Sequence, residues 1–204
     1  MKRPAHFTGF LVGLLRGSRM VALCSLIAGV AGCGGDSNNT SVSISGTITG
    51  LTEGGLVLSN GVSNVALGAN ATAFTFPSRV LIGSPYSIRP STLPANLLCT
   101  VANGNGVAGT DSIDQVKVSC VPRHALGGMV TGLTASGLIL VNGSDTVAVP
   151  ANTQSFVFAV KVGEGFSYGV TVLQQPAPQR CDVATNGSGL MGVADINNVQ
   201  VACQ

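Results

Sequence analysis

Six cysteines are the side chains of this 204-residue chain with the clearest capacity for chemistry. Four of them form two pairs with nearly the same spacing, Cys99 with Cys120 and Cys181 with Cys203. No C-x-x-C string occurs, and His124 is the only histidine after Thr40, so no metal site is predicted. If the protein is in an oxidising compartment, each pair is expected to form a disulfide. We predict that this bond faces the core and links the last two strands of a small domain.

Two glycine strings of the form G-x-G-x-x-G, at 104–109 and 187–192, have the spacing of a phosphate-binding turn. A dinucleotide site needs such a string to follow a strand and to open a helix whose N-terminal amides hold the pyrophosphate. Residues 111–118, which follow the first string, read DSIDQVKV, a run that favours a strand. The strings are therefore predicted to be loops between strands, and neither a dinucleotide nor another cofactor is expected.

Groups for acid–base chemistry are few and scattered. Asp111 and Asp114 are the closest acidic pair after Thr40, and the second half of the chain has Ala194 and Asn197 at the matching places. His124 follows a proline and an arginine and is predicted to be a solvated linker residue. No G-x-S-x-G string marks a nucleophile. We therefore expect no catalysis, with a small hydrolase left as the weakest of three hypotheses.

Aromatic groups that stack on sugars are also scarce, with no Trp, 2 Tyr and 7 Phe. Tyr86 and Tyr168 each lie near a Gly/Pro bend on a predicted strand, which is typical of a packing residue, although stacking on a ligand stays open. A glycan- or peptide-binding module that uses the loops of one half of the chain is thus the alternative to a structural role.

Charged residues make up only 9% of the chain. Four of the ten Lys and Arg residues lie within residues 1–32, so the rest of the chain carries six against eight Asp and Glu, a net charge of 6 − 8 = −2. These six basic residues are scattered rather than gathered in a stripe. Nucleic acid is therefore not expected as a partner.

Residues 1–32 are predicted to be a helical signal peptide. Basic residues precede an apolar run, Met20 to Ala31, which is shorter than the roughly 20 residues that cross a bilayer. The run ends in the string Val30-Ala31-Gly32-Cys33. This string resembles the lipobox of bacterial lipoproteins, and the resemblance implies cleavage before Cys33 and attachment of fatty acids such as palmitate to it. An ordinary signal peptide cut near Ala31 is the alternative.

The same resemblance extends to localisation. Gly34, rather than an aspartate, follows Cys33. In the lipoprotein family this implies passage to the outer membrane of a Gram-negative bacterium. Residues 33–41 are then a lipidated, flexible linker, and the membrane is a partner through the lipid.

The remainder of the chain consists of two copies of one sequence module. Sliding the chain against itself until Gly46 meets Gly128 aligns GTITGLTEGGLVLSNG (46–61) with GMVTGLTASGLILVNG (128–143), and 18 of 38 positions are identical between 46–83 and 128–165. One inserted residue near Thr185 then aligns Cys120 with Cys203. We predict two domains, repeat 1 at 42–122 and repeat 2 at 123–204, each about 80 residues long.

Apolar and polar residues alternate within each repeat, as in half-buried strands. Strands are predicted near 42–49, 55–59, 62–67, 72–77, 85–90, 97–102 and 114–121, and at matching places in repeat 2. Asn60-Gly61 and Asn142-Gly143 predict hairpins. This pattern favours an all-β chain of two tandem β-sandwiches with an immunoglobulin-like or transthyretin-like layout.

The strand pattern of residues 42–204 is similar to that of the Ig-like modules found in tandem on bacterial surface proteins. A lipobox followed at once by a duplicated, disulfide-closed β module favours a structural or adhesive envelope protein that interacts with another envelope protein or a surface ligand.

Overall fold

The computed structural model describes residues 40–204. The predicted signal peptide, Cys33 and residues 33–39 of the predicted linker lie outside the described residues. The described part is built of β-strands joined by turns and belongs to one compact unit, which confirms the all-β fold class. Residues 40–204 contain no helix with the length and hydropathy of a membrane span.

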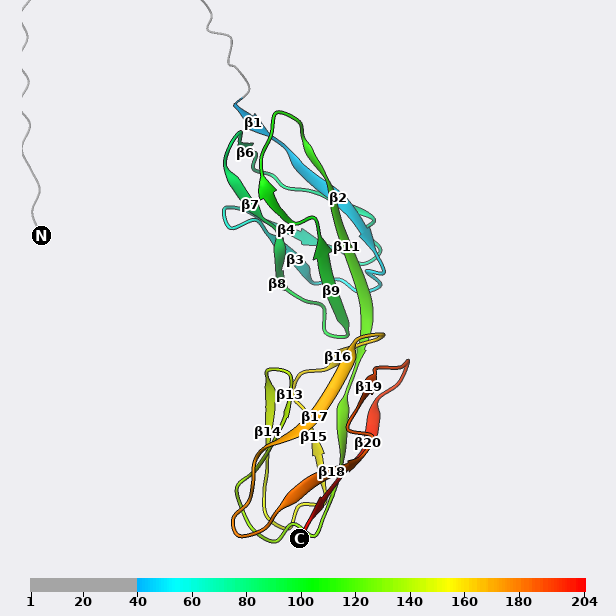
Figure 1. Cartoon of the computed structure of the whole chain (residues 1–204). Helices are drawn as coiled ribbons and strands as arrows, with labels where there is room; N and C mark the ends of the chain where they lie inside the picture. Colours follow the sequence, from blue (N-terminus) through cyan, green and yellow to red (C-terminus); the bar gives the residue numbers. More distant parts are fainter. Residues whose placement is uncertain (1–39) are drawn as a thin grey trace, which may run out of the picture. The chain divides into compact units, whose positions relative to one another are not determined.

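The strands of repeat 1 are β1 (Ser41–Val42), β2 (Ile44–Thr49), β3 (Leu56–Ser59), β4 (Asn64–Leu67), β5 (Ala73–Thr75), β6 (Val80–Leu81), β7 (Pro85–Ser87), β8 (Arg89–Thr92), β9 (Leu97–Ala102), β10 (Asn105–Val107) and β11 (Ile113–His124). One sheet has the order β5-β2-β11-β9. The second has the order β4-β3-β8, and β7, which leads into β8 across Ile88, pairs with β10. A short ribbon of β1 and β6 lies where the described chain begins (Figure 1).

The strands of repeat 2 are β12 (Leu126–Thr131), β13 (Leu138–Asn142), β14 (Asp145–Val149), β15 (Ser155–Val157), β16 (Val162–Gly163), β17 (Ser167–Gln174), β18 (Cys181–Thr185), β19 (Ser188–Leu190) and β20 (Ile196–Cys203). They form two four-stranded sheets of order β15-β12-β20-β18 and β14-β13-β17-β19. These match the sheets of repeat 1 strand for strand, with β17 in the place of β7 and β8.

The opening strand of each sandwich runs parallel to its closing strand. In repeat 1, β2 pairs with β11 along Gly46↔Val116 to Thr49↔Ser119, and in repeat 2, β12 pairs with β20 in the same way. Figure 1 shows β2 and β11 side by side. In the constant-type immunoglobulin order, the first strand instead pairs with the second. The strand order of these sandwiches therefore differs from the constant-type immunoglobulin order at this point.

Each sandwich has its own core, filled from both sheets. In repeat 1, Ile44 and Val116 of one sheet and Leu56 and Leu58 of the other are fully buried in one cluster. Leu126, Leu138, Leu140 and Val199 form the corresponding cluster in repeat 2. The alternating pattern therefore places one face of each strand inside, as predicted. Even the edge-to-face phenylalanine pair is repeated, with ring centroids 5.8 Å apart in both Phe74–Phe76 and Phe156–Phe158.

The two repeats share even the unusual backbone torsion angles at matching positions. Asn70 and Asn152 both have a φ of 62°, and Asn103 and Asn186 have φ values of 57° and 56°. Because positive φ is costly for residues other than glycine, its recurrence at matched asparagines reflects a shared local structure.

The residue inserted into repeat 2 is Ala184. In repeat 1, Val101 and Ala102 pair with consecutive residues of β11, whereas the register in repeat 2 jumps from Val183 to Thr185 and leaves Ala184 unpaired. A β-bulge therefore absorbs the extra residue without reversing the faces of β18.

The predicted boundary between residues 122 and 123 falls inside β11. This strand pairs with β9 as far as Pro122, and its next two residues, Arg123 and His124, pair with Gly163 and Val162 of β16. The two repeats are thus joined by a continuous strand rather than by a linker.

Candidate functional site

Both predicted disulfides are present, Cys99–Cys120 and Cys181–Cys203. Each links two residues that face one another directly across an antiparallel pair, β9 with β11 and β18 with β20. Three of the four cysteines are buried, and Cys203 packs half-buried against the core of repeat 2. Their positions confirm the predicted pairing and the core-facing orientation. Strands β10 and β19 come between the linked strands in chain order, so these strands are neighbours in the sheet but are not the last two in sequence.

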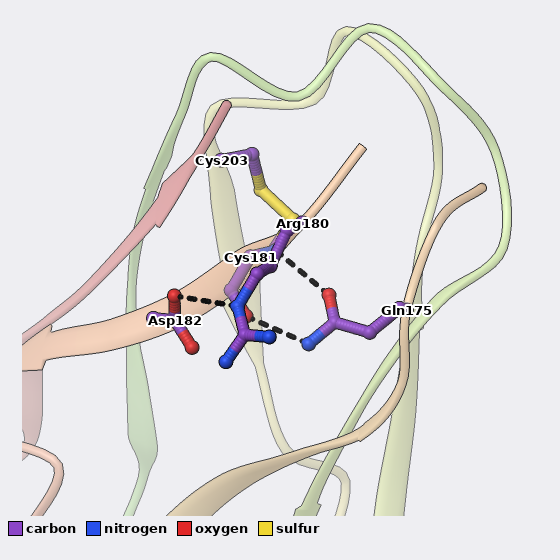
Figure 2. Close-up of polar contacts among 5 residues, drawn as sticks. All are labelled: Gln175, Arg180, Cys181, Asp182 and Cys203. Atoms are coloured by element: carbon purple, nitrogen blue, oxygen red, sulfur yellow. Dashed lines mark hydrogen bonds and ion pairs between the residues drawn. A yellow bond between two sulfur atoms is a disulfide. The ribbon is translucent and has the colours of Figure 1, made fainter. Parts of the chain in front are cut away.

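The Gln175 side chain hydrogen-bonds the main chain of Cys181 on both sides, next to the second disulfide, and we call this arrangement the glutamine clamp (Figure 2). The Gln175 Oε1 atom accepts a hydrogen bond of 2.7 Å from the Cys181 amide, and Gln175 Nε2 donates one of 2.9 Å to the Cys181 carbonyl oxygen. Beside it, Arg180 Nε donates to Asp182 Oδ2 at 3.3 Å, an exposed pair that contributes little. Repeat 1 has Leu93 in the place of Gln175 (175 − 82 = 93). Nothing in the sequence predicts this clamp, because a lone glutamine belongs to no recognisable motif.

The glycine strings have a packing role. A Cβ on Gly106 would lie 2.8 Å from the Tyr86 hydroxyl oxygen, and one on Gly189 would lie 3.1 Å from that of Tyr168, so each tyrosine ring covers a glycine. Both tyrosines also pack against their cores, which confirms their predicted packing role. Part of each string is a short strand, β10 or β19, rather than the loop that was predicted. A strand follows each string, so neither string leads into a helix whose N-terminus could bind a pyrophosphate.

One shallow pocket in repeat 1 brings two of the singled-out residues together. Tyr86 and Asp114 line it together with Asn103 and Gln115, around a volume of about 310 Å³. Asn103 Nδ2 donates to the Gln115 carbonyl oxygen at 3.0 Å, which holds the rim of the pocket. Asp111, the other member of the acidic pair, does not line it. A carboxylate beside a phenol and amides can hydrogen-bond a polar ligand such as a sugar or a peptide.

A second polar hollow lies in repeat 2, between β17 and β18. Its volume is about 550 Å³, and Thr171, Thr185 and Asn186 are among its polar lining residues. Ala184, the bulged residue, lies in the same wall. The insertion therefore changes the outline of this hollow relative to the corresponding surface of repeat 1.

His124 is not the solvated linker residue that the sequence predicted. It is the last residue of β11, and its side chain is 18% exposed. Its Nε2 atom lies 3.9 Å from Glu164 Oε2, and its Nδ1 atom lies 3.9 Å from Asp195 Oδ1, which also accepts a hydrogen bond from the Ala125 amide. Nε2 is buried and has no hydrogen-bond partner. Across residues 40–204, no three metal-ligating side chains converge closely enough to hold an ion.

No protein-family model matches this chain, and no curated protein matches it. Among solved structures, the chain is similar to one titled "The Bacillus anthracis TIE protein", with 13% sequence identity and a TM-score of 0.29. The match covers 80% of this chain and 34% of that one, so the chain spans about a third of its length. This likeness is too slight to identify a function.

Proposed function

We propose that this chain is a lipid-anchored protein of the cell envelope, in the outer membrane of a Gram-negative bacterium, with a structural or adhesive role and no catalytic activity. The basic region, the short apolar run and the Val30–Cys33 string support the anchor. The two disulfides fit such a location, because they persist in oxidising compartments.

The observation that carries this proposal is what the two repeats have in common. Both keep the disulfide, the tyrosine packed over a glycine and the asparagines with positive φ. Of their charged positions, only Arg79 and Lys161 correspond. Groups that set the shape are therefore retained, whereas groups that could do chemistry are replaced. This contrast favours a protein whose useful property is its form.

The shared strand supports the same role. The Glu164 amide of repeat 2 donates a hydrogen bond of 2.8 Å to the Pro122 carbonyl oxygen of repeat 1, next to the pairing of β11 with β16. A module attached in this way can present its loops, or dock another envelope protein, from a fixed support.

The anchor is tested by replacing Cys33 with Ser in cells that express the full chain. The variant is expected to leave the membrane fraction and to lose incorporation of an alkynyl palmitate analogue. Cys24→Ser is the matched control, because it removes a cysteine from the apolar run and is expected to keep both properties. Retention of the Cys33→Ser protein in the membrane, or labelling that persists, would refute the anchor.

The pocket around Tyr86 and Asp114 favours a second candidate, a glycan- or peptide-binding module that uses one repeat. Binding to an array of glycans and peptides is the first measurement. Any ligand found there should bind more weakly to Asp114→Asn, whereas Asp111→Asn, just outside the pocket, should bind normally. Equal loss in both variants, or no ligand at all, would remove this candidate.

A further inference from the structure

Three of the four exposed large apolar side chains of repeat 1 are gathered at one end. Over residues 40–122, the large hydrophobic side chains that are exposed are Val62, Leu81, Ile82 and Val107, with exposed fractions of 86%, 60%, 40% and 67%. Leu81 ends β6, Ile82 follows it, Val107 ends β10, and Val62 lies in the turn between β3 and β4. We call Leu81, Ile82 and Val107 the apolar end of repeat 1.

Hydrogen bonds place these segments where the described chain begins. The Ile82 amide donates to the Thr40 carbonyl oxygen at 2.8 Å, and Leu81 pairs with Ser41. The Gly83 amide donates to the Ala108 carbonyl oxygen at 2.7 Å, which brings the end of β10 to the same site. Figure 1 shows β1 and β6 together at this end.

Repeat 2 offers an internal comparison, because its residues at the positions of Leu81 and Ile82 are in contact with repeat 1. Leu81 and Ile82 correspond to Gly163 and Glu164 (81 + 82 = 163; 82 + 82 = 164). Gly163 pairs with Arg123 and is buried, and the Glu164 amide donates to the Pro122 carbonyl oxygen of repeat 1. This end of the module is thus a docking surface in repeat 2. In repeat 1, the same positions carry larger and more apolar side chains.

We infer that the apolar end of repeat 1 rests on the lipid surface of the membrane that holds the anchor, an inference that depends on the lipid anchor proposed above. Only 40 − 33 = 7 residue steps separate Cys33 from Thr40, which limits their separation to about 25 Å at full extension. An acylated Cys33 therefore keeps this end close to the bilayer. Exposed Leu, Ile and Val side chains at that distance gain by entering the interfacial region.

The charges near this end suit a neutral lipid surface better than a strongly charged one. Arg79 donates through Nη2 to the Ser41 carbonyl oxygen at 2.8 Å, and Asp111 lies exposed in the loop after β10. Asp36 also lies in the segment between Cys33 and Thr40, so one basic and two acidic groups offer no net attraction to anionic lipids. Contact is therefore expected with vesicles of phosphatidylcholine alone.

The test uses the acylated full chain in phosphatidylcholine vesicles, with a fluorophore on one introduced cysteine. The other cysteines after the cleavage site are occupied, one by lipid and four by disulfides. Val107→Cys and Leu190→Cys form a matched pair, because residue 190 is the counterpart of residue 107 (107 + 83 = 190) and is exposed in repeat 2. Lipids brominated in their acyl chains are expected to quench the label at residue 107 strongly and the label at residue 190 little.

Adding Leu81→Ser and Ile82→Ser to the Val107→Cys chain should abolish the quenching while the protein stays in the membrane fraction. Equal quenching at residues 107 and 190, or none at residue 107 in a chain that is demonstrably acylated, would overturn the inference and leave the anchor intact. A failure of the lipid anchor would be detected by a different measurement, because the Cys33→Ser protein would then stay in the membrane fraction. Protection of the residue 107 label in the unlipidated Cys33→Ser chain, increasing with protein concentration, would assign this end to a second copy and would also overturn the inference.

Discussion

Cys99 and Cys120 face one another across β9 and β11 with their Cα atoms 4.0 Å apart, and Cys181 and Cys203 do the same across β18 and β20. The sequence separation that the bond closes is 21 in repeat 1 and 22 in repeat 2. Removing the cross-link with the double substitution Cys99→Ala/Cys120→Ala should lower the free energy of unfolding of repeat 1 by roughly 3 kcal/mol.

Denaturant unfolding measures this effect. Reducing agent should destabilise the parent chain but should leave unchanged the transition of a chain that lacks both bonds. A double-alanine variant as stable as the parent would contradict a stabilising role for the disulfide.

Gln175 should contribute measurably to the stability of repeat 2, because its side chain satisfies both backbone polar groups of the buried Cys181. Gln175→Leu, which installs the residue type of repeat 1, should cost about 1–3 kcal/mol, since it leaves these groups without their partner. Gln200→Leu, at an exposed site on β20, is the control and should change stability little. Equal effects of the two variants in thermal unfolding would show that the clamp is unimportant.

Gly128 lies opposite Val199 where β12 pairs with β20, close to the backbone of that strand. A Cβ at this position would overlap the carbonyl oxygen of Val199, and the same holds for Gly46 and Val116 in repeat 1. Because main-chain atoms of a paired strand cannot rotate away, Gly128→Ala should destabilise repeat 2 by about 1–3 kcal/mol.

Gly192→Ala is the control for this substitution, since a Cβ there meets no atom within 4 Å. It should be nearly neutral in chemical unfolding. A Gly128→Ala protein as stable as Gly192→Ala would show that the two strands separate easily at this point.

Deleting Ala184 should be tolerated, because it restores the uninterrupted register of repeat 1. Deleting Thr100 in repeat 1 should instead reverse the faces of the residues between Cys99 and the end of β9, since there is no bulge to absorb the change. Amide NMR spectra should show a folded protein for the first deletion and loss of native dispersion in repeat 1 for the second. Unfolding of repeat 2 without Ala184 would refute the assignment of the bulge.

Inserting Gly-Ser-Gly between Pro122 and Arg123 should separate the two repeats in their unfolding. The insertion interrupts β11 at the point where pairing passes from β9 to β16. Hydrogen exchange should then accelerate at Glu164, whose amide donates to Pro122, but not at Ala108, whose amide donates to Ser84 within repeat 1. Unchanged exchange at Glu164 would contradict a continuous junction.

Much of this architecture could be predicted from sequence because repetition and alternation are strong signals. The offset that aligns Gly46 with Gly128 located the repeats, and residues such as Ile44 and Ile48, separated by polar neighbours, marked the buried faces. The cysteine pairs were predictable from their recurrence. Short elements were not, since β6 and β16 have two residues each and β10 is formed by Asn-Gly-Val, a run without strand character.

The errors at the junction and the omission of the glutamine clamp have a different cause. His124 follows Pro122 and Arg123 in sequence, a string that gives no sign of a strand, yet pairing with Val162 places it in a strand and half-buries it. Gln175 lies between two predicted strands, and its importance depends on Cys181, a partner further along the chain whose backbone direction only the folded chain defines. Both depend on tertiary pairing, which local patterns do not encode.

The parallel neighbours β2 and β11, and β12 and β20, determine how this protein would respond to tension. Pulling the two ends of a repeat apart slides its opening strand past its closing strand, so their hydrogen bonds are strained in shear together rather than opened one after another. Because β11 passes uninterrupted from one repeat to the next, there is no flexible linker between them that could extend before the strands are loaded. A chain held at one end by a membrane and at the other by a bound partner would therefore resist extension until a whole strand pair gave way.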